Sequence, residues 1–179
     1  NLRFDDGVQL QLGTGSDLRI SHDSNHSYIS QEGTGALFIR NTTNDQDIIF
    51  QSDDGSGGVA TYFQLDGSQA TDTGNLFTKW GDNSFISLGN SSDLYIFHDG
   101  TDSKIQNSTG DLVFENSADD KDIVFRSDDG SGGLSTYFRV DGGLGATIIP
   151  DNKSLGFGSI GDMYISHDGT NTKIENFTG

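Results

Sequence analysis

The segment Ser92-Asp93-Leu94-Tyr95-Ile96-Phe97-His98-Asp99-Gly100 decides the fold expected for this chain. Its residue types alternate with a period of two, so that Leu94, Ile96 and His98 lie on one face of a strand. Asp99-Gly100 then predicts a tight turn, because Gly tolerates a positive φ and Asp bonds to nearby backbone amides. We therefore expect a return strand through Ser103–Ile105.

This segment occurs three times, since it returns as residues 16–23 and 161–168. The histidines of the three copies are 76 and 69 residues apart. In the first copy Ser24 stands where the others have Gly, so we expect that turn to differ. Self-similarity at a near-constant period is typical of proteins built from stacked units.

A second block, Ser52–Gly58, recurs unchanged as Ser127–Gly133. Residues 35–67 and 110–142 are identical at 19 of 33 positions, so the two stretches must share one backbone. Short apolar runs between clusters of Gly, Asp, Asn and Ser predict further strands. They are residues 37–39, 47–50 and 61–67 and their equivalents 112–114, 122–125 and 136–142.

The chain accordingly divides into β repeat units at 8–74 and 75–152 and a partial unit at 153–179. It begins and ends inside a repeat, so we expect it to be a segment of a longer fibre. No stretch shows a helical period of 3.6, and the predicted fold class is all-β.

Composition limits both the core and the partners. Apolar residues make up 31% of the chain, against about 45–50% in typical globular proteins. The net charge of −17 argues against nucleic-acid binding and against adhesion to an anionic membrane. No apolar run approaches the length of a membrane span, so membrane insertion is not expected.

Two architectures satisfy these observations. One is a single-chain β-solenoid, in which each turn stacks on the last. The other is an elongated, intertwined homotrimer, in which three chains pool thin apolar faces around one axis. The units are long for one solenoid coil and poor in apolar residues, which favours the homotrimer.

Residues 89–105 and 109–112 resemble a repeat with the pattern gSSDLxIyHDGtnSxIxnxTGdLyi. That repeat is found in tail-fibre and virion structural proteins of marine phages, including cyanophages. Residues 151–158 are similar to the lead-in DNkxlxfG of the same repeats. The resemblance implies a virion-borne or extracellular fibre, often trimeric, that serves host attachment. It implies no particular receptor.

Three histidines and two acidic pairs are the candidate site residues. One histidine per unit lies in phase with the apolar strand face, and in a trimer such a histidine could bind a metal ion. The acidic pairs offer hard oxygen ligands that suit calcium, although their spacing matches neither the EF-hand pattern nor the nine-residue Gly-Asp repeat. The alternatives are a histidine bonded to its own turn and a solvated acidic loop, and we favour these. The candidates are His22, His98, His167, Asp53, Asp54, Asp128 and Asp129.

The function expected is therefore that of a non-enzymatic structural segment of a phage tail fibre or a similar extracellular fibre. Duplicated acidic pairs do not resemble the single carboxylate pair of a glycosidase. The alternatives are a carbohydrate-binding or calcium-dependent adhesion module, which could contact host surface glycan, and a cellular extracellular filament. No cofactor other than calcium is suggested.

Overall fold

The computed structural model describes residues 3–69 and 74–177, which form β-strands and no helix. The predicted all-β fold class is confirmed. No helix in this described part is long and apolar enough to cross a membrane. The strands are β1 (Gln9–Leu12), β2 (Leu18–His22), β3 (Ser27–Gln31), β4 (Ile48–Asp53), β5 (Val59–Asp66), β6 (Phe77–Lys79), β7 (Ile86–Leu88), β8 (Leu94–His98), β9 (Ser103–Asn107), β10 (Ile123–Asp128), β11 (Leu134–Asp141), β12 (Ala146–Ile148), β13 (Ser154–Phe157), β14 (Met163–His167) and β15 (Thr172–Asn176).

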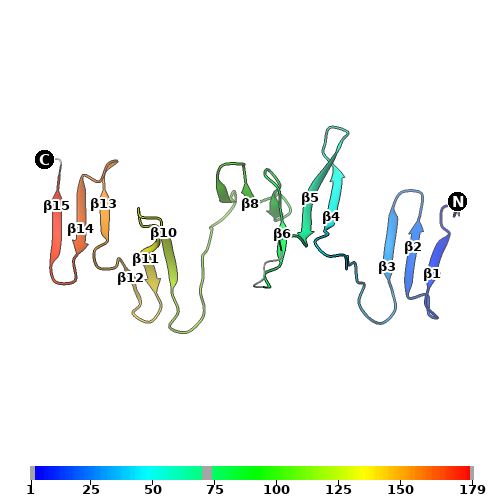
Figure 1. The fold of residues 1–179 in the computed structure, drawn as a ribbon, viewed down its shortest axis with the longest axis horizontal. Helices are drawn as coiled ribbons and strands as arrows, with labels where there is room; N and C mark the ends of the chain where they lie inside the picture. The colour runs from blue at the N-terminus through cyan, green and yellow to red at the C-terminus, as the bar shows by residue number, and fades with distance from the viewer. Residues whose placement is uncertain (1–2, 70–73, 178–179) are drawn as a thin grey trace. The chain divides into compact units, whose positions relative to one another are not determined.

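The strands form five separate three-stranded antiparallel sheets, each made of consecutive strands (Figure 1). Two kinds of sheet alternate along the chain. We call β1–β3, β7–β9 and β13–β15 the His sheets, because the second strand of each ends in the repeated histidine. We call β4–β6 and β10–β12 the Asp-loop sheets, because the Asp-Asp-Gly-Ser-Gly-Gly block joins their first two strands.

The chain divides into two compact units, residues 1–108 and 109–179. The first contains β1–β9, and the second contains β10–β15. Within each unit the described strands pair only with strands of their own sheet.

The register of the His sheets places one apolar row on one face. In the sheet β7–β9, Ile86 pairs with Ile96, which pairs with Ile105. The equivalent rows are Leu10, Ile20 and Ile29 in β1–β3 and Leu155, Ile165 and Ile174 in β13–β15. The structure therefore confirms the alternation of side chains between the two strand faces that was predicted for residues 92–100.

The Asp-loop sheets share a β-bulge. Phe50 pairs with Phe63, but the next residue, Gln51, pairs with Thr61, so Tyr62 is the extra residue of the bulged strand. The register of β10–β11 shifts at the equivalent place, after Phe125. The high identity between 35–67 and 110–142 thus corresponds to one shared backbone, as predicted.

The single chain has no apolar core in its described part. The only buried residues there are Asp66, which is 6% exposed, and Asp141, which is 9% exposed. The apolar rows of the sheets stay partly open to solvent, since Ile20 is 43% exposed and Ile96 is 40% exposed.

Two expectations are corrected. Residues 37–39 and 112–114 form no strand, although their apolar runs predicted one, because no neighbouring segment pairs with their backbone. The turn at Ser24 does not differ from its copies. Ser24 adopts a φ of 83°, close to the 95° of Gly100, and Asp23 N donates to His26 O at 3.1 Å as in the other turns.

The unequal spacing of the histidines comes largely from one connection. The β5–β6 connection spans 67–76, whereas the β11–β12 connection spans only 142–145. Six of the seven extra residues in the first spacing therefore lie there. The first sequence unit ends at residue 74, and β6 follows that boundary. It nevertheless belongs to the sheet of β4 and β5.

Candidate functional site: an apolar face that ends in histidine

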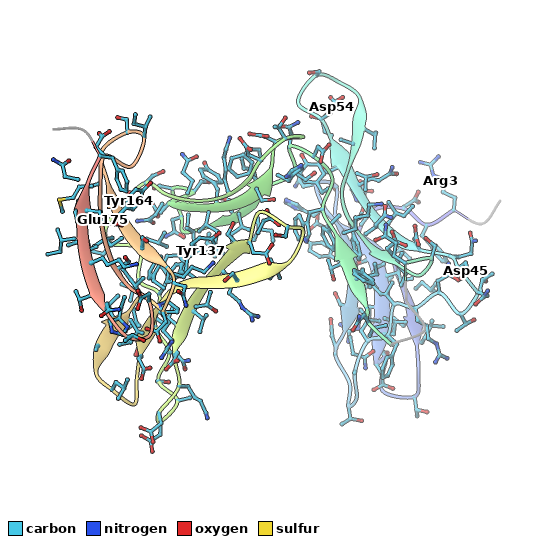
Figure 2. The ribbon with its side chains drawn as sticks, turned by 60° about the vertical axis from the view of Figure 1, so that its left-hand side comes forward. Arg3, Asp45, Asp54, Tyr137, Tyr164 and Glu175 are labelled. Carbon is cyan, nitrogen blue, oxygen red and sulfur yellow. The ribbon has the colours of Figure 1, made fainter. Side chains whose placement is uncertain are left out.

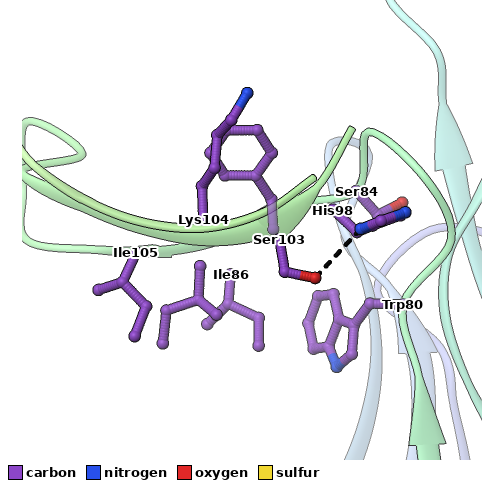
Figure 3. A pocket seen from close by; sticks show the side chains of 9 residues that line it. Trp80, Ser84, Ile86, His98, Ser103, Lys104 and Ile105 are labelled. Atoms are coloured by element: carbon purple, nitrogen blue, oxygen red, sulfur yellow. Dashed lines mark hydrogen bonds between the residues drawn. The ribbon is translucent and has the colours of Figure 1, made fainter. Parts of the chain in front are cut away.

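A hollow of about 540 Å³ lies on the apolar face of the sheet β7–β9. Ile86, Ile96 and Ile105 form its floor, and Trp80 lies on the same side of the sheet (Figure 3). His98 and Ser103 lie at one end, where the ring Nδ1 is 3.1 Å from the Ser103 Oγ.

The same hollow recurs on the other two His sheets, with volumes of about 320 and 230 Å³. In each, a large apolar residue that precedes the first strand takes the place of Trp80. The equivalent linings are Phe4, Leu10, Ile20, His22 and Ser27 in the first copy, and Ile149, Leu155, Ile165, His167 and Thr172 in the third. A threefold recurrence of one lining indicates a role that each repeat performs, rather than a site built once.

The three histidines use Nδ1 to bond near their own turn. His22 Nδ1 is 3.1 Å from the Ser27 Oγ, as in the second copy. His167 Nδ1 instead lies 2.9 Å from the Asp151 Oδ1, and Thr172 stands where the other two copies have serine. Each histidine belongs to a different sheet, so the described chain does not gather them into one metal site.

The aspartate after each histidine organises the turn. Asp99 Oδ1 accepts bonds from the backbone amides of Asp102 and Thr101, and its other oxygen is paired with Lys104. The pKa of Asp99 is well below its usual value, because these bonds stabilise the charged carboxylate. The bond from the Asp102 amide has the largest effect, followed by those from Lys104 and the Thr101 amide.

The third copy repeats this turn and the first copy varies it. The Asn171 amide, then Lys173 and the Thr170 amide, lower the pKa of Asp168 to about 2. In the first copy Tyr28 replaces the lysine, and its hydroxyl donates to Asp23 at 2.9 Å. The feature that all three turns share is thus the aspartate that accepts backbone amide bonds, whereas the cation is present in two of them.

The acidic pairs lie at the tips of the β4–β5 and β10–β11 hairpins, where Figure 2 labels Asp54. Asp54 Oδ1 accepts bonds from Ser56 N at 2.7 Å and Gly58 N at 3.0 Å, and these bonds lower the pKa of Asp54. Asp53 Oδ2 accepts from Gly55 N at 2.9 Å. Asp128 and Asp129 repeat all three bonds.

The carboxylates of both pairs therefore stabilise their own loops. Within the described residues, no three side chains of the kinds that bind metals come together. The side chains of the two bulge tyrosines also bond to these loops. The Tyr62 hydroxyl donates to the Asp53 carbonyl at 2.9 Å, and the Tyr137 hydroxyl donates to the Asp128 carbonyl at 2.7 Å. The loop conformation is thus fixed by internal hydrogen bonds.

Sequence reasoning missed the two buried aspartates, Asp66 and Asp141. Asp66 Oδ1 accepts bonds from the Ser68 hydroxyl and from the amides of Ser68 and Gln69. Asp141 accepts from the Leu144 amide at 2.8 Å. The signal that could have found them is the Asp-Gly pair at the end of the second strand, present in both copies.

The hollows suit the burial of apolar surface. Their polar groups gather at the end near the histidine, and their floors are aliphatic. Comparison of the chain with protein-family models, with curated proteins and with solved structures finds no match.

Proposed function

We propose that this chain is a non-enzymatic structural segment of a fibre, formed by self-association of identical copies as a homotrimer. The observation that carries the proposal is the lack of any buried apolar side chain in the described residues, combined with a repeated apolar row on every His sheet. A chain that stayed alone would expose those rows to water, at a cost of about 25 cal/mol for each Å².

The uncovered apolar surface supports association. Large apolar side chains are exposed within the sheets themselves, as Ile29, Ile105 and Ile174 are 61%, 52% and 71% exposed. Burial of such rows against other copies would remove this apolar surface from water.

Strand pairing favours an oligomer over a single-chain solenoid. In a solenoid, strands of one turn pair with those of the next, whereas the described strands pair only inside their own three-stranded sheets. Cover for the apolar rows would then come from other copies. The resemblance of residues 89–105 to phage tail-fibre repeats supports three copies, a virion or extracellular location and a role in host attachment.

The test is the molar mass of the chain by light scattering coupled to size exclusion, at several concentrations, with and without chelator. A mass of three times 19.2 kDa that does not change in chelator is the expected result. A folded monomer at micromolar concentration would overturn the proposal. A trimer that dissociates in chelator would instead assign a metal to the histidines or the acidic loops and favour the adhesion module.

A further inference from the structure

Two equivalent segments of the chain are extended but belong to no sheet. They are Ala36–Arg40, which lies between β3 and β4, and Asp111–Glu115, which lies between β9 and β10 (Figure 1). We call them the unpaired segments. None of their backbone N–H or C=O groups bonds to another backbone group of the described chain. Water satisfies such groups while they are exposed, but an assembly that buried these segments would have to pair them.

The side chains of the unpaired segments are apolar on both faces. Leu37, Phe38 and Ile39 are consecutive, as are their equivalents 112–114, so alternate residues project to opposite sides. Phe38 is 79% exposed and Val113 is 71% exposed. A continuous apolar run of this kind is typical of a strand that is covered on both faces.

Each unpaired segment is anchored at its C-terminal end. Asn41 Nδ2 donates to the Asp47 carbonyl at 3.2 Å, and its Oδ1 accepts from Thr43 N at 3.0 Å. Asn116 makes the same two bonds, to the Asp122 carbonyl and from Ala118 N. The anchor fixes the turn that follows, and it leaves the backbone of the apolar run free to pair.

We propose that each unpaired segment adds as a strand to the edge of a sheet that another copy of this chain contributes. This inference rests on the self-association proposed above and names the surface through which it occurs. A second copy is the partner because the chain supplies both halves of the contact. Its three-stranded sheets have open edges, and edge strands present rows of unpaired N–H and C=O groups that accept a further strand.

Recurrence supports the same partner. The two unpaired segments occupy one position in two repeats, 75 residues apart, as do the sheets that follow them. Copies aligned in register would therefore present segments and edges at matching levels. The exchange of strands between copies would also cover the apolar side chains, which the chain's own sheets leave exposed.

The experiment is hydrogen–deuterium exchange on the whole chain, combined with its molar mass in solution. The amides of 37–39 and 112–114 are expected to exchange at least about 10-fold more slowly than unpaired amides, because pairing protects them. The double variant Phe38→Pro/Val113→Pro removes one N–H from each segment and is expected to lose that protection and the oligomer. The matched control Phe38→Tyr/Val113→Thr keeps every N–H and is expected to retain both.

The outcomes separate the two proposals. An oligomer whose amides at 37–39 and 112–114 exchange freely would overturn this inference and leave the proposed function standing. A folded monomer would overturn both. Retention of protection and mass in the proline variant would also contradict the inference. Amide exchange at β8 and β9 reports whether the proline variant keeps its own sheets. If the variant loses them, the protection of 37–39 and 112–114 in the wild-type chain decides whether these segments are paired.

Discussion

The two Asp-loop sheets have the same pairing and the same bulge, but they neutralise their aspartates in different ways. In β4–β6, the Gln64 amide lies 3.2 Å from Asp47 and 3.3 Å from Asp66, and the cation comes from the neighbouring strand. That cation is Lys79, which pairs with Gln64 in the register and lies 3.7 Å from Asp66.

In β10–β12 the cation lies in the central strand itself. Arg139 takes the position of Gln64, with its Nε 3.2 Å from Asp122 and 3.0 Å from Asp141. Its neighbour in the register is Ile148, which takes the position of Lys79. Each sheet therefore keeps one cation near its pair of aspartates, and either of two cross-strand positions can supply it. This follows because cross-strand neighbours lie within reach of the same side chains.

The two sheets also differ in their aromatic stacks, and this difference gives the largest expected effect. Phe63 stacks on Phe50 at 4.5 Å and on Trp80 at 4.9 Å, whereas Phe138 stacks on Phe125 alone among the described residues, at 4.2 Å. Each ring pair contributes about 0.5–1.5 kcal/mol. We expect Phe63→Leu to lower the free energy of unfolding by about 2 kcal/mol, and Phe138→Leu by about 1 kcal/mol.

Denaturant unfolding at one protein concentration measures both variants. Trp80→Leu is the control, because it removes one of the two stacks of Phe63 and should make that sheet resemble its copy. Equal losses for Phe63→Leu and Phe138→Leu would show that the third ring adds nothing to the first sheet.

The charge difference gives the next effect. Arg139→Gln leaves Asp122 and Asp141 without their cation, since Ile148 cannot replace it. We expect the Tm to fall by roughly 2–4 °C, which corresponds to about 1 kcal/mol in a chain of this size. Adding Ile148→Lys should restore the Tm, because it rebuilds the Gln–Lys arrangement of the first sheet.

The reverse exchange tests the same idea in the first sheet. Lys79→Ile should lower the Tm, and the further change Gln64→Arg should restore it. With the remaining single variants Ile148→Lys and Gln64→Arg, thermal melts of the four single and two double variants complete a double-mutant cycle for each sheet. Additive effects in both cycles would mean that positions 64 and 79, and 139 and 148, act independently.

A pH titration extends the comparison to an exposed ion pair. The pKa of Asp168 is lowered from 3.8 to about 2, so the stability that it contributes is present above pH 3.8 and is lost as the pH falls toward 2. Lys173→Met removes one cause and should raise that pKa toward 3.8. The loss of stability attributable to Asp168 would then shrink. Carboxyl NMR shifts measure the pKa, and an unchanged value would mean that the turn amides alone set it.

The smallest effect is expected at the turn of the first His sheet. Ser24 holds a φ of 83°, where Gly has no steric cost and other residues are strained. Ser24→Gly should stabilise the chain by about 0.5 kcal/mol, and Gly100→Ser should destabilise it by a similar amount. Unfolding curves of the two variants decide this. A destabilised Ser24→Gly variant would show that the serine makes a compensating contact.

The sequence determined by itself what depends on neighbouring residues. The alternation of residues 92–100, the Asp-capped turn and the return strand all follow from local backbone geometry, and the structure confirms them. The low apolar content and the repetition also indicated a thin-layered all-β chain. Alternation of apolar and polar residues with a period of two can be read from neighbouring residues, without any long-range information.

Only the tertiary structure decided which strands pair and which charges meet. The bulge at Tyr62, the buried Asp66 and its contact with Lys79 depend on how β5 aligns with β4 and β6, which no local pattern of residue types specifies. The apolar run 37–39 reads as a strand but has no partner in its own chain, because pairing requires a second backbone that local sequence does not specify. Alternation of residue types fixes which way a side chain points, whereas the neighbour that it meets is fixed by the packing of the chain.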